Sequence, residues 1–143
     1  MQEKKAINDK LFEMLNQAIA REIQVSIQYM WQHIQARGFK GKIVGEDMKK
    51  ISITEMKHAE DIAEHLVSLG SIPTTKPNTI EVGSSLKEML ELDIKAEEEA
   101  IKLYKEIINF AKEQDDLATK RLFEKILLEE MEHLQLFENY LVD

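Results

Sequence analysis

Apolar residues recur every three or four positions along most of this chain, a spacing typical of helices that bury one face. Gly38 and Gly41 are expected to form the turn after the first helix, and Gly70 is expected to end the second. The pair Asp115 and Asp116 offers an N-cap for a last helix. The pattern thus predicts four helices, over residues 5–37, 42–69, 85–112 and from that cap to about residue 140.

Residues 71–84 interrupt the helical pattern with both prolines, three threonines and Gly83. Ser85 and Glu88 then fit a capping box at the start of the third helix. The connection is longer than a turn between antiparallel neighbours needs, so the third helix can start at the end of the bundle where the second began. We therefore expect an all-α fold, a ferritin-like four-helix bundle with a long crossover, formed as one domain over residues 1–143.

The first helix carries two apolar stripes, about 100° apart around its axis. The first stripe contains Leu11, Leu15, Ala18, Val25 and Tyr29, and the second contains Ile19, Ile23, Ile27, Met30 and Ile34. Since one core needs only one stripe, the second predicts a surface buried against another subunit, or against a ligand held between subunits. A single broad core face is the alternative.

The overall composition narrows the classes of function. A net charge of −8 argues against nucleic acid as a main partner, because phosphate binding needs clustered Lys and Arg. The chain has no cysteine, which excludes disulfides, thiolate metal sites and cysteine nucleophiles. We find neither a signal peptide nor an apolar run long enough to span a membrane, and expect a cytoplasmic protein.

Two of the predicted helices carry the same motif, Glu-x-x-His. The motif residues are Glu55 and His58 in the second helix, and Glu130 and His133 in the fourth. Residues three apart lie on one helix face, and in both helices that face is the apolar one. A Glu-x-x-His from each of two helices, joined by a Glu from each of two others, is a known way to hold two metal ions in a bundle.

The other two helices supply the missing glutamates. Glu22 falls within the core stripe of the first helix. In the run Glu97, Glu98 and Glu99, the apolar phase selects Glu97 as the inward residue, while the other two face outward. Both selected glutamates precede the glutamate of a Glu-x-x-His motif by 33 residues. The chain therefore resembles two related helical hairpins, an arrangement that suits a site for two metals.

Electrostatics favours a metal site over a bare core. An ionised carboxylate buried without a partner costs many kcal/mol or takes up a proton. Two divalent cations would balance four carboxylates, and oxygen and imidazole ligands suit iron, manganese or zinc. Any one of these glutamates could instead pair with a lysine or reach the surface at a helix end. Six ligands in phase, with duplicated spacing, make that alternative a poor account of the set.

At these residues the chain resembles the ferritin-like superfamily, and bacterioferritins most closely. The resemblance is carried by residues 21–23, 28–29, 52–59, 88–90 and 129–133. It implies a di-iron ferroxidase of bacterioferritin or mini-ferritin type. Such an enzyme binds two Fe(II) and passes their electrons to O₂ or hydrogen peroxide, either to store the Fe(III) as mineral or to detoxify iron. The implied ligand sets are Glu22 with His58 for one iron and Glu97 with His133 for the other, bridged by Glu55 and Glu130. Tyr29 and Tyr104, each seven residues after a terminal glutamate, are expected beside the site.

The resemblance also implies a homo-oligomer with a dimer as its building unit, up to a hollow shell. Met56 matches the position at which bacterioferritins bind haem b between two subunits. A methionine in a dimer interface without haem is the alternative. The sequence ends ten residues after His133, so the short fifth helix of bacterioferritins is not expected.

Two other functions stay open at this stage. One is a rubrerythrin-like dimer that reduces peroxide or O₂. Rubrerythrins place an additional glutamate where this chain has Ala100 and usually carry a Cys-rich domain, so the sequence disfavours this reading. The other is a four-helix protein that binds metal without catalysis.

Overall fold

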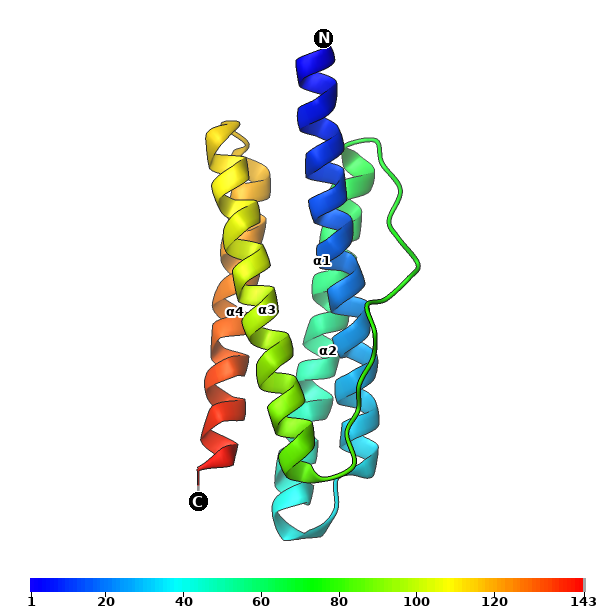
Figure 1. The fold of residues 1–143 in the computed structure, drawn as a ribbon, viewed down its shortest axis with the longest axis vertical. Helices are drawn as coiled ribbons and strands as arrows, with labels where there is room; N and C mark the ends of the chain where they lie inside the picture. The colour runs from blue at the N-terminus through cyan, green and yellow to red at the C-terminus, as the bar shows by residue number, and fades with distance from the viewer. Residues whose placement is uncertain (143) are drawn as a thin grey trace.

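A computed structural model describes residues 1–142, and these residues form four long helices (Figure 1). The helices are α1 (Gln2–Gln35), α2 (Gly38–Ser68), α3 (Leu86–Glu113) and α4 (Leu117–Leu141). Figure 1 shows α1 beside α2, α3 beside α4, and a long connection that returns along the outside of the bundle before α3 begins. As a result α2 and α3 run in the same direction. The predicted all-α bundle with a long crossover is confirmed. Within residues 1–142, none of the helices has a stretch apolar enough to cross a membrane.

Side-chain caps define where α3 and α4 begin. The Ser85 hydroxyl accepts a hydrogen bond from the backbone N–H of Glu88 at 3.1 Å. The Asp116 carboxylate accepts one from the backbone N–H of Thr119, also at 3.1 Å. Each cap satisfies a backbone donor that has no partner inside its helix. The predicted Asp116 cap and the serine half of the predicted capping box are confirmed, whereas the Glu88 carboxylate accepts a hydrogen bond from the Ser84 hydroxyl at 3.4 Å instead of completing the box.

The turn between α1 and α2 is shorter than the sequence pattern predicts. We expected Gly38 and Gly41 to share this turn, but α2 already begins at Gly38 and Gly41 lies inside the helix. A Cβ atom on Gly41 would lie 3.1 Å from the carbonyl carbon of Ala36. The glycine therefore permits close contact between the end of α1 and the start of α2 rather than a break in the helix. The other helix ends differ from the predictions by one to three residues.

Polar side chains of α1 hold the crossover against the bundle. The side chain of Asn16 donates to the Ile72 carbonyl at 3.2 Å and accepts from the backbone N–H of Thr74 at 2.8 Å. Further along, the Gln32 side chain donates to the Val82 carbonyl at 2.9 Å. These bonds satisfy backbone groups in a segment without regular structure, and so fix its course along α1.

The core consists of two apolar clusters with a polar layer between them. One cluster contains Leu15, Ile62, Leu66, Tyr104 and Phe123, and the other contains Val25, Tyr29, Met48, Leu90 and Phe137. On α3 the side chains of Ala96, Ala100 and Ile107 are buried in this core, whereas Ile94, Ile101 and Ile108 are only half-buried. The polar layer between the clusters holds the candidate site.

Candidate metal centre

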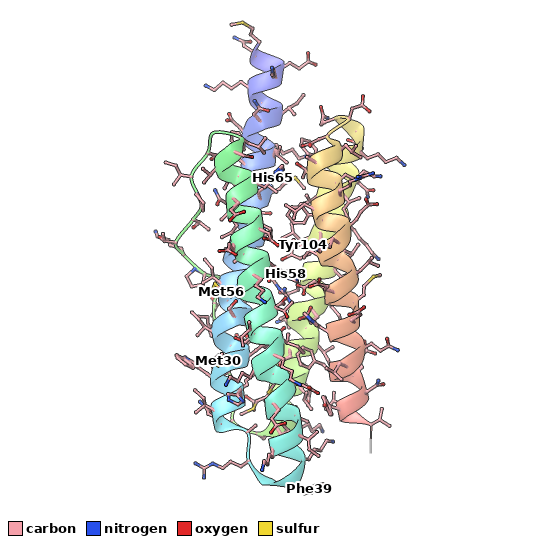
Figure 2. All side chains as sticks on the ribbon, turned by 180° about the vertical axis from the view of Figure 1, so that it is seen from behind. Met30, Phe39, Met56, His58, His65 and Tyr104 are labelled. Carbon is pink, nitrogen blue, oxygen red and sulfur yellow. The ribbon has the colours of Figure 1, made fainter. Side chains whose placement is uncertain are left out.

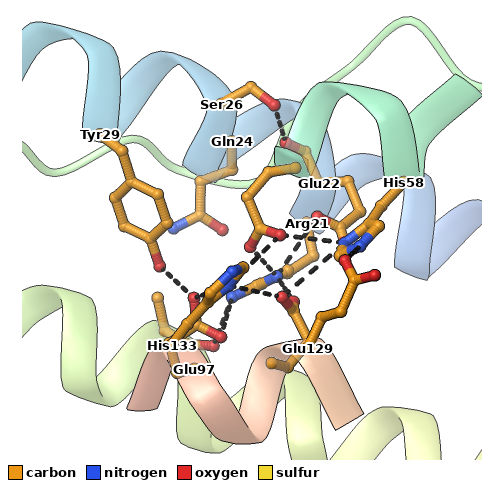
Figure 3. Close-up of polar contacts among 12 residues, drawn as sticks. Arg21, Glu22, Gln24, Ser26, Tyr29, His58, Glu97, Glu129 and His133 are labelled. Atoms are coloured by element: carbon orange, nitrogen blue, oxygen red, sulfur yellow. Dashed lines mark hydrogen bonds and ion pairs between the residues drawn. The ribbon is translucent and has the colours of Figure 1, made fainter. Parts of the chain in front are cut away.

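The six predicted ligand side chains meet at the middle of the bundle (Figure 3). All four glutamates are fully buried, and the two histidines are at most 9% exposed. Within the run of three glutamates, the neighbours of Glu97 are exposed, as the helical phase indicates. Each helix thus contributes one buried glutamate, and α2 and α4 add a histidine one turn later.

The ligand atoms form two overlapping groups, and within each group all the atoms lie within 4.8 Å of one another. One group contains Glu22, Glu55, His58 and Glu130, and the other contains Glu55, Glu97, Glu130 and His133. Glu55 and Glu130 belong to both groups. Two cations could therefore share these two carboxylates and each have one further glutamate and one histidine, which is the arrangement that the resemblance implies.

The two tyrosines cross-link the halves of the site. The Tyr29 hydroxyl of α1 donates to Glu97 of α3, and the Tyr104 hydroxyl of α3 donates to Glu22 of α1, each at 2.8 Å. Burial raises the pKa of both tyrosines well above the usual range, so both stay protonated donors. Each tyrosine therefore holds one glutamate of the cluster through a hydrogen bond from the opposite half of the bundle.

Each histidine lies beside the glutamate of its own motif. Nδ1 of His58 is 3.0 Å from Glu55, and Nδ1 of His133 is 3.1 Å from Glu130. Burial lowers the pKa of His58, but the surrounding carboxylates, Glu22 foremost, together outweigh burial and raise it to about 9. Burial also lowers the pKa of His133, but the surrounding carboxylates, Glu130 and Glu97 foremost, together outweigh burial and raise it to about 10.

Glu129 is a functional candidate that the sequence did not indicate. Its carboxylate lies 2.6 Å from Nε2 of His58, the ring nitrogen that faces away from Glu55 (Figure 3). Carboxylates commonly orient metal-binding histidines in this way. Glu129 is on α4 and His58 is on α2, so only the packing of the two helices creates this pair.

Arg21 is the second side chain that the sequence analysis missed as part of the site. It is 3% exposed, and its guanidinium reaches into the glutamate cluster (Figure 3). Nη1 lies 2.8 Å from Glu55, 3.3 Å from Glu22 and in contact with Glu130, and Nη2 lies 3.1 Å from Glu97. Burial lowers the pKa of Arg21, but the four carboxylates together raise it well above the usual range.

The donor atoms of the cluster fit divalent metal ions. Oε1 of Glu55, Nδ1 of His58 and Oε2 of Glu97 are buried and make close charged contacts, at 3.0 Å between Glu55 and His58 and at 3.1 Å between Glu97 and Arg21, but no hydrogen bond of good geometry within residues 1–142. Burial, together with repulsion from Glu130 and Glu22, raises the pKa of Glu55 well above the usual range. Buried polar atoms without good hydrogen bonds are unfavourable, and binding a divalent cation through these oxygen and imidazole nitrogen atoms would satisfy them.

A further buried carboxyl group, Asp93, lies one helical turn before Glu97 on α3. It has no exposed surface, and its Oδ1 accepts a hydrogen bond from the Gln28 side chain at 3.0 Å. Its Oδ2 and the side-chain oxygen of Gln32 have no hydrogen-bond partner within the described residues. Burial raises the pKa of Asp93 to about 8, although the amides of Gln28 and Gln32 act in the opposite direction.

An apolar groove follows the outer face of α1 and α2. Figure 2 shows Met30 and Met56 on this side of the bundle. Met56 is half exposed, and the groove has a volume of about 670 Å³. Its lining includes most of the second stripe of α1, namely Ile19, Ile23, Ile27 and Met30. Most of this second stripe therefore lines a surface groove.

Comparison with known proteins identifies relatives over almost the whole chain. Residues 12–143 match the ferritin-like domain family. The bacterioferritin of Desulfovibrio desulfuricans is 39% identical over 91% of this chain and 73% of its own length. The bacterioferritin of Rhodobacter capsulatus is 30% identical over 90% of this chain and 81% of its own.

Solved structures agree with the sequence matches. The D. desulfuricans bacterioferritin, whose diiron site was studied in different catalytic states, has a TM-score of 0.87 at 37% identity, covering 94% of this chain and 79% of its own. A ferritin-like diiron-carboxylate protein from Bacillus anthracis has a TM-score of 0.91 at 25% identity, covering 94% of this chain and 97% of its own. The R. capsulatus bacterioferritin, solved with a metal-free dinuclear site and haem iron, has a TM-score of 0.86 at 28% identity, covering 92% of this chain and 82% of its own. With its crossover bundle and a buried glutamate and histidine cluster at the centre, the chain belongs to the ferritin-like family.

Proposed function

We propose that this chain is a ferroxidase of bacterioferritin type, which binds two Fe(II) as substrate and passes their electrons to O₂ or hydrogen peroxide. The observation that carries this proposal is the pair of overlapping ligand groups that share Glu55 and Glu130. Two adjacent iron ions supply two electrons together, which is the number that reduction of one peroxide requires. The bacterioferritin relatives support the same activity.

The surrounding side chains have defined roles in this proposal. Glu22 with His58 holds one iron, Glu97 with His133 holds the other, and the two shared glutamates bridge them. Tyr29 and Tyr104 hold the terminal carboxylates in place through their hydrogen bonds. Glu129 fixes the ring of His58. Zinc does not fit the proposed reaction because Zn(II) does not change oxidation state. Iron is preferred over manganese because Fe(II) gives up an electron to O₂ or peroxide more readily than Mn(II) does.

The groove on α1 and α2 supports a homo-oligomer. An exposed apolar surface of this kind is typical of an interface, and we propose that two copies pair across it to form a dimer, the building unit of a larger assembly that stores iron. Met56 faces this groove, so its sulfur could bind haem b between two copies. An absorbance spectrum of the purified protein distinguishes this role from a plain apolar contact, because only bound haem gives a Soret band.

The experiment that tests the function follows Fe(II) oxidation after addition of O₂ or peroxide, with light scattering to give the mass of the assembly. We expect Glu130→Ala to abolish oxidation because it removes a bridging ligand. Glu132→Ala is the matched control, because Glu132 lies two residues away on the exposed face of α4. Oxidation by the Glu130→Ala protein at the wild-type rate would contradict the ligand assignment.

The same experiment separates the competing functions. Oxidised iron that accumulates in a large assembly supports the proposed ferroxidase and its storage role. A dimer that consumes peroxide without accumulating iron indicates a rubrerythrin-like reductase instead, and metal binding without turnover indicates a non-catalytic protein.

The single domain over residues 1–143 and the cytoplasmic location remain predictions from the sequence.

A further inference from the structure

One guanidinium contacts all four glutamates of the cluster. Nη1 of Arg21 pairs with Glu22, Glu55 and Glu130, and Nη2 pairs with Glu97 (Figure 3). The Arg21 side chain lies in the same buried layer as the ligands. The planar, two-armed shape of the group allows contacts that the single ammonium of a lysine could not make together.

The charges explain why a cation in this place matters. Ionised carboxylates in a low-dielectric layer repel one another strongly, and the guanidinium of Arg21, beside the two histidines, offsets part of that repulsion. Two divalent cations would balance the four carboxylates by themselves, so the arginine charge then becomes surplus. Arg21 also contacts Oε2 of Glu55 and Oε2 of Glu130, oxygens of the two shared carboxylates. Metal ions and the guanidinium thus compete for the same carboxylates.

Arg21 does not follow the duplicated plan of the chain. A shift of 75 residues relates Glu22 to Glu97 and Tyr29 to Tyr104, but it relates Arg21 to Ala96. Ala96 is buried, and its carbonyl oxygen lies 3.4 Å from Nη2 of Arg21. The small residue on α3 leaves room for the guanidinium from α1. The cation is therefore an addition to the symmetric ligand set, contributed by one half of the chain.

We propose that Arg21 is an internal counter-cation, which stabilises the glutamate cluster before metal binds and releases the carboxylates when metal enters. This inference rests on the proposed metal site, where Arg21 competes with the metal ions for the carboxylates. Arg21 then lowers the affinity for metal and raises the stability of the metal-free protein. A residue that only fills space would affect stability with and without metal alike.

Zn(II) tests this inference without any redox reaction. The variants are Arg21→Gln, which removes the charge, and Arg21→Lys, which keeps the charge but not the two-armed contacts. Arg121→Gln is the control, since Arg121 is exposed on α4. For each protein, the Zn(II) dissociation constant is measured by competition with a chelating dye, and the melting temperature is measured in EDTA and in excess Zn(II). Glu130→Ala lacks a proposed bridging ligand, so the Zn(II) that this variant still binds measures binding outside the cluster.

We expect Arg21→Gln to bind Zn(II) more tightly than wild type by a factor of about 5 to 150, the usual range of coupling between two ligands. Arg21→Gln should also melt at a lower temperature than wild type in EDTA, and excess Zn(II) should raise its melting temperature by more. For each quantity, we expect the value of Arg21→Lys to lie between those of wild type and Arg21→Gln. A variant that folds only with Zn(II) supports the proposal as well. Equal Zn(II) affinity in Arg21→Gln and Arg121→Gln overturns it, and so does a variant that stays unfolded in excess Zn(II).

The outcomes also separate this inference from the proposed function. A wild-type protein that binds Zn(II) at the cluster but does not oxidise iron refutes the ferroxidase and leaves the role of Arg21 intact. A wild-type protein whose Zn(II) binding equals that of Glu130→Ala refutes the metal site, and the inference with it.

Discussion

The buried carboxyl group of Asp93 gives a pH dependence of stability with a definite sign. Its pKa in the folded protein is about 8, compared with 3.8 for an unperturbed aspartate. Between these values the folded protein keeps a proton that the unfolded chain has lost, so the free energy of unfolding falls as the pH rises. The slope for one proton is about 1.4 kcal/mol per pH unit. From pH 5 to pH 7 the loss is therefore about 3 kcal/mol.

Asp93→Asn removes this titration with little change of shape. The asparagine oxygen can still accept the hydrogen bond from Gln28. Its amide replaces Oδ2, which has no partner in residues 1–142, and can donate to the side-chain oxygen of Gln32, which also has none. We therefore expect the stability of Asp93→Asn relative to wild type to rise by about 3 kcal/mol between pH 5 and pH 7.

Urea unfolding in EDTA at pH 5, 6 and 7 measures this difference, at one protein concentration throughout. The glutamates and histidines of the cluster titrate in both proteins, so their common contribution cancels in the comparison. Asp61→Asn, at an exposed position of α2, controls for the loss of a carboxyl group. A stability difference that stays constant over this pH range would show that Asp93 is ionised in the folded protein, against the reasoning above.

Three further perturbations test the surroundings of the site. Tyr104→Phe removes the hydrogen bond to Glu22 and should destabilise the protein by about 1 kcal/mol in urea unfolding; an unchanged midpoint would mean that this bond contributes nothing. Phe123→Ala empties a fully buried position that packs on Tyr104, at a cost of about 3–5 kcal/mol, and a loss below 1 kcal/mol would contradict tight packing there. Glu129→Ala should weaken Zn(II) binding about 10- to 100-fold by freeing the ring of His58, whereas Glu132→Ala should leave it unchanged.

The helical period was enough to predict the four helices and the buried glutamates. Glu97 could be selected from three adjacent glutamates because successive residues of a helix lie about 100° apart around its axis. The other two glutamates of the run, Glu98 and Glu99, are exposed. The crossover could be predicted because residues 71–84 hold both prolines. These features depend on local sequence, which is why they can be read without a structure.

The features that the sequence did not show depend on contacts between helices. Arg21 lies outside the predicted apolar stripes of α1, and only the carboxylates of the other helices explain its burial. The sequence pattern places Glu129 outside the apolar face of α4, and only its contact with His58 of α2 connects it to the site. Gly41 was assigned to a turn because its use in close packing depends on the path of α1. Sequence periodicity indicates which face of a helix is buried, but not which residue from another helix meets it.

The central claim is that these six side chains hold two metal ions side by side. The most direct test is crystallography of protein loaded anaerobically with Fe(II), with anomalous data collected on both sides of the iron edge. The account predicts two anomalous peaks inside the bundle, one among Glu22, Glu55, Glu130 and His58 and the other among Glu55, Glu97, Glu130 and His133. A single peak, or peaks only outside this cluster, would contradict it.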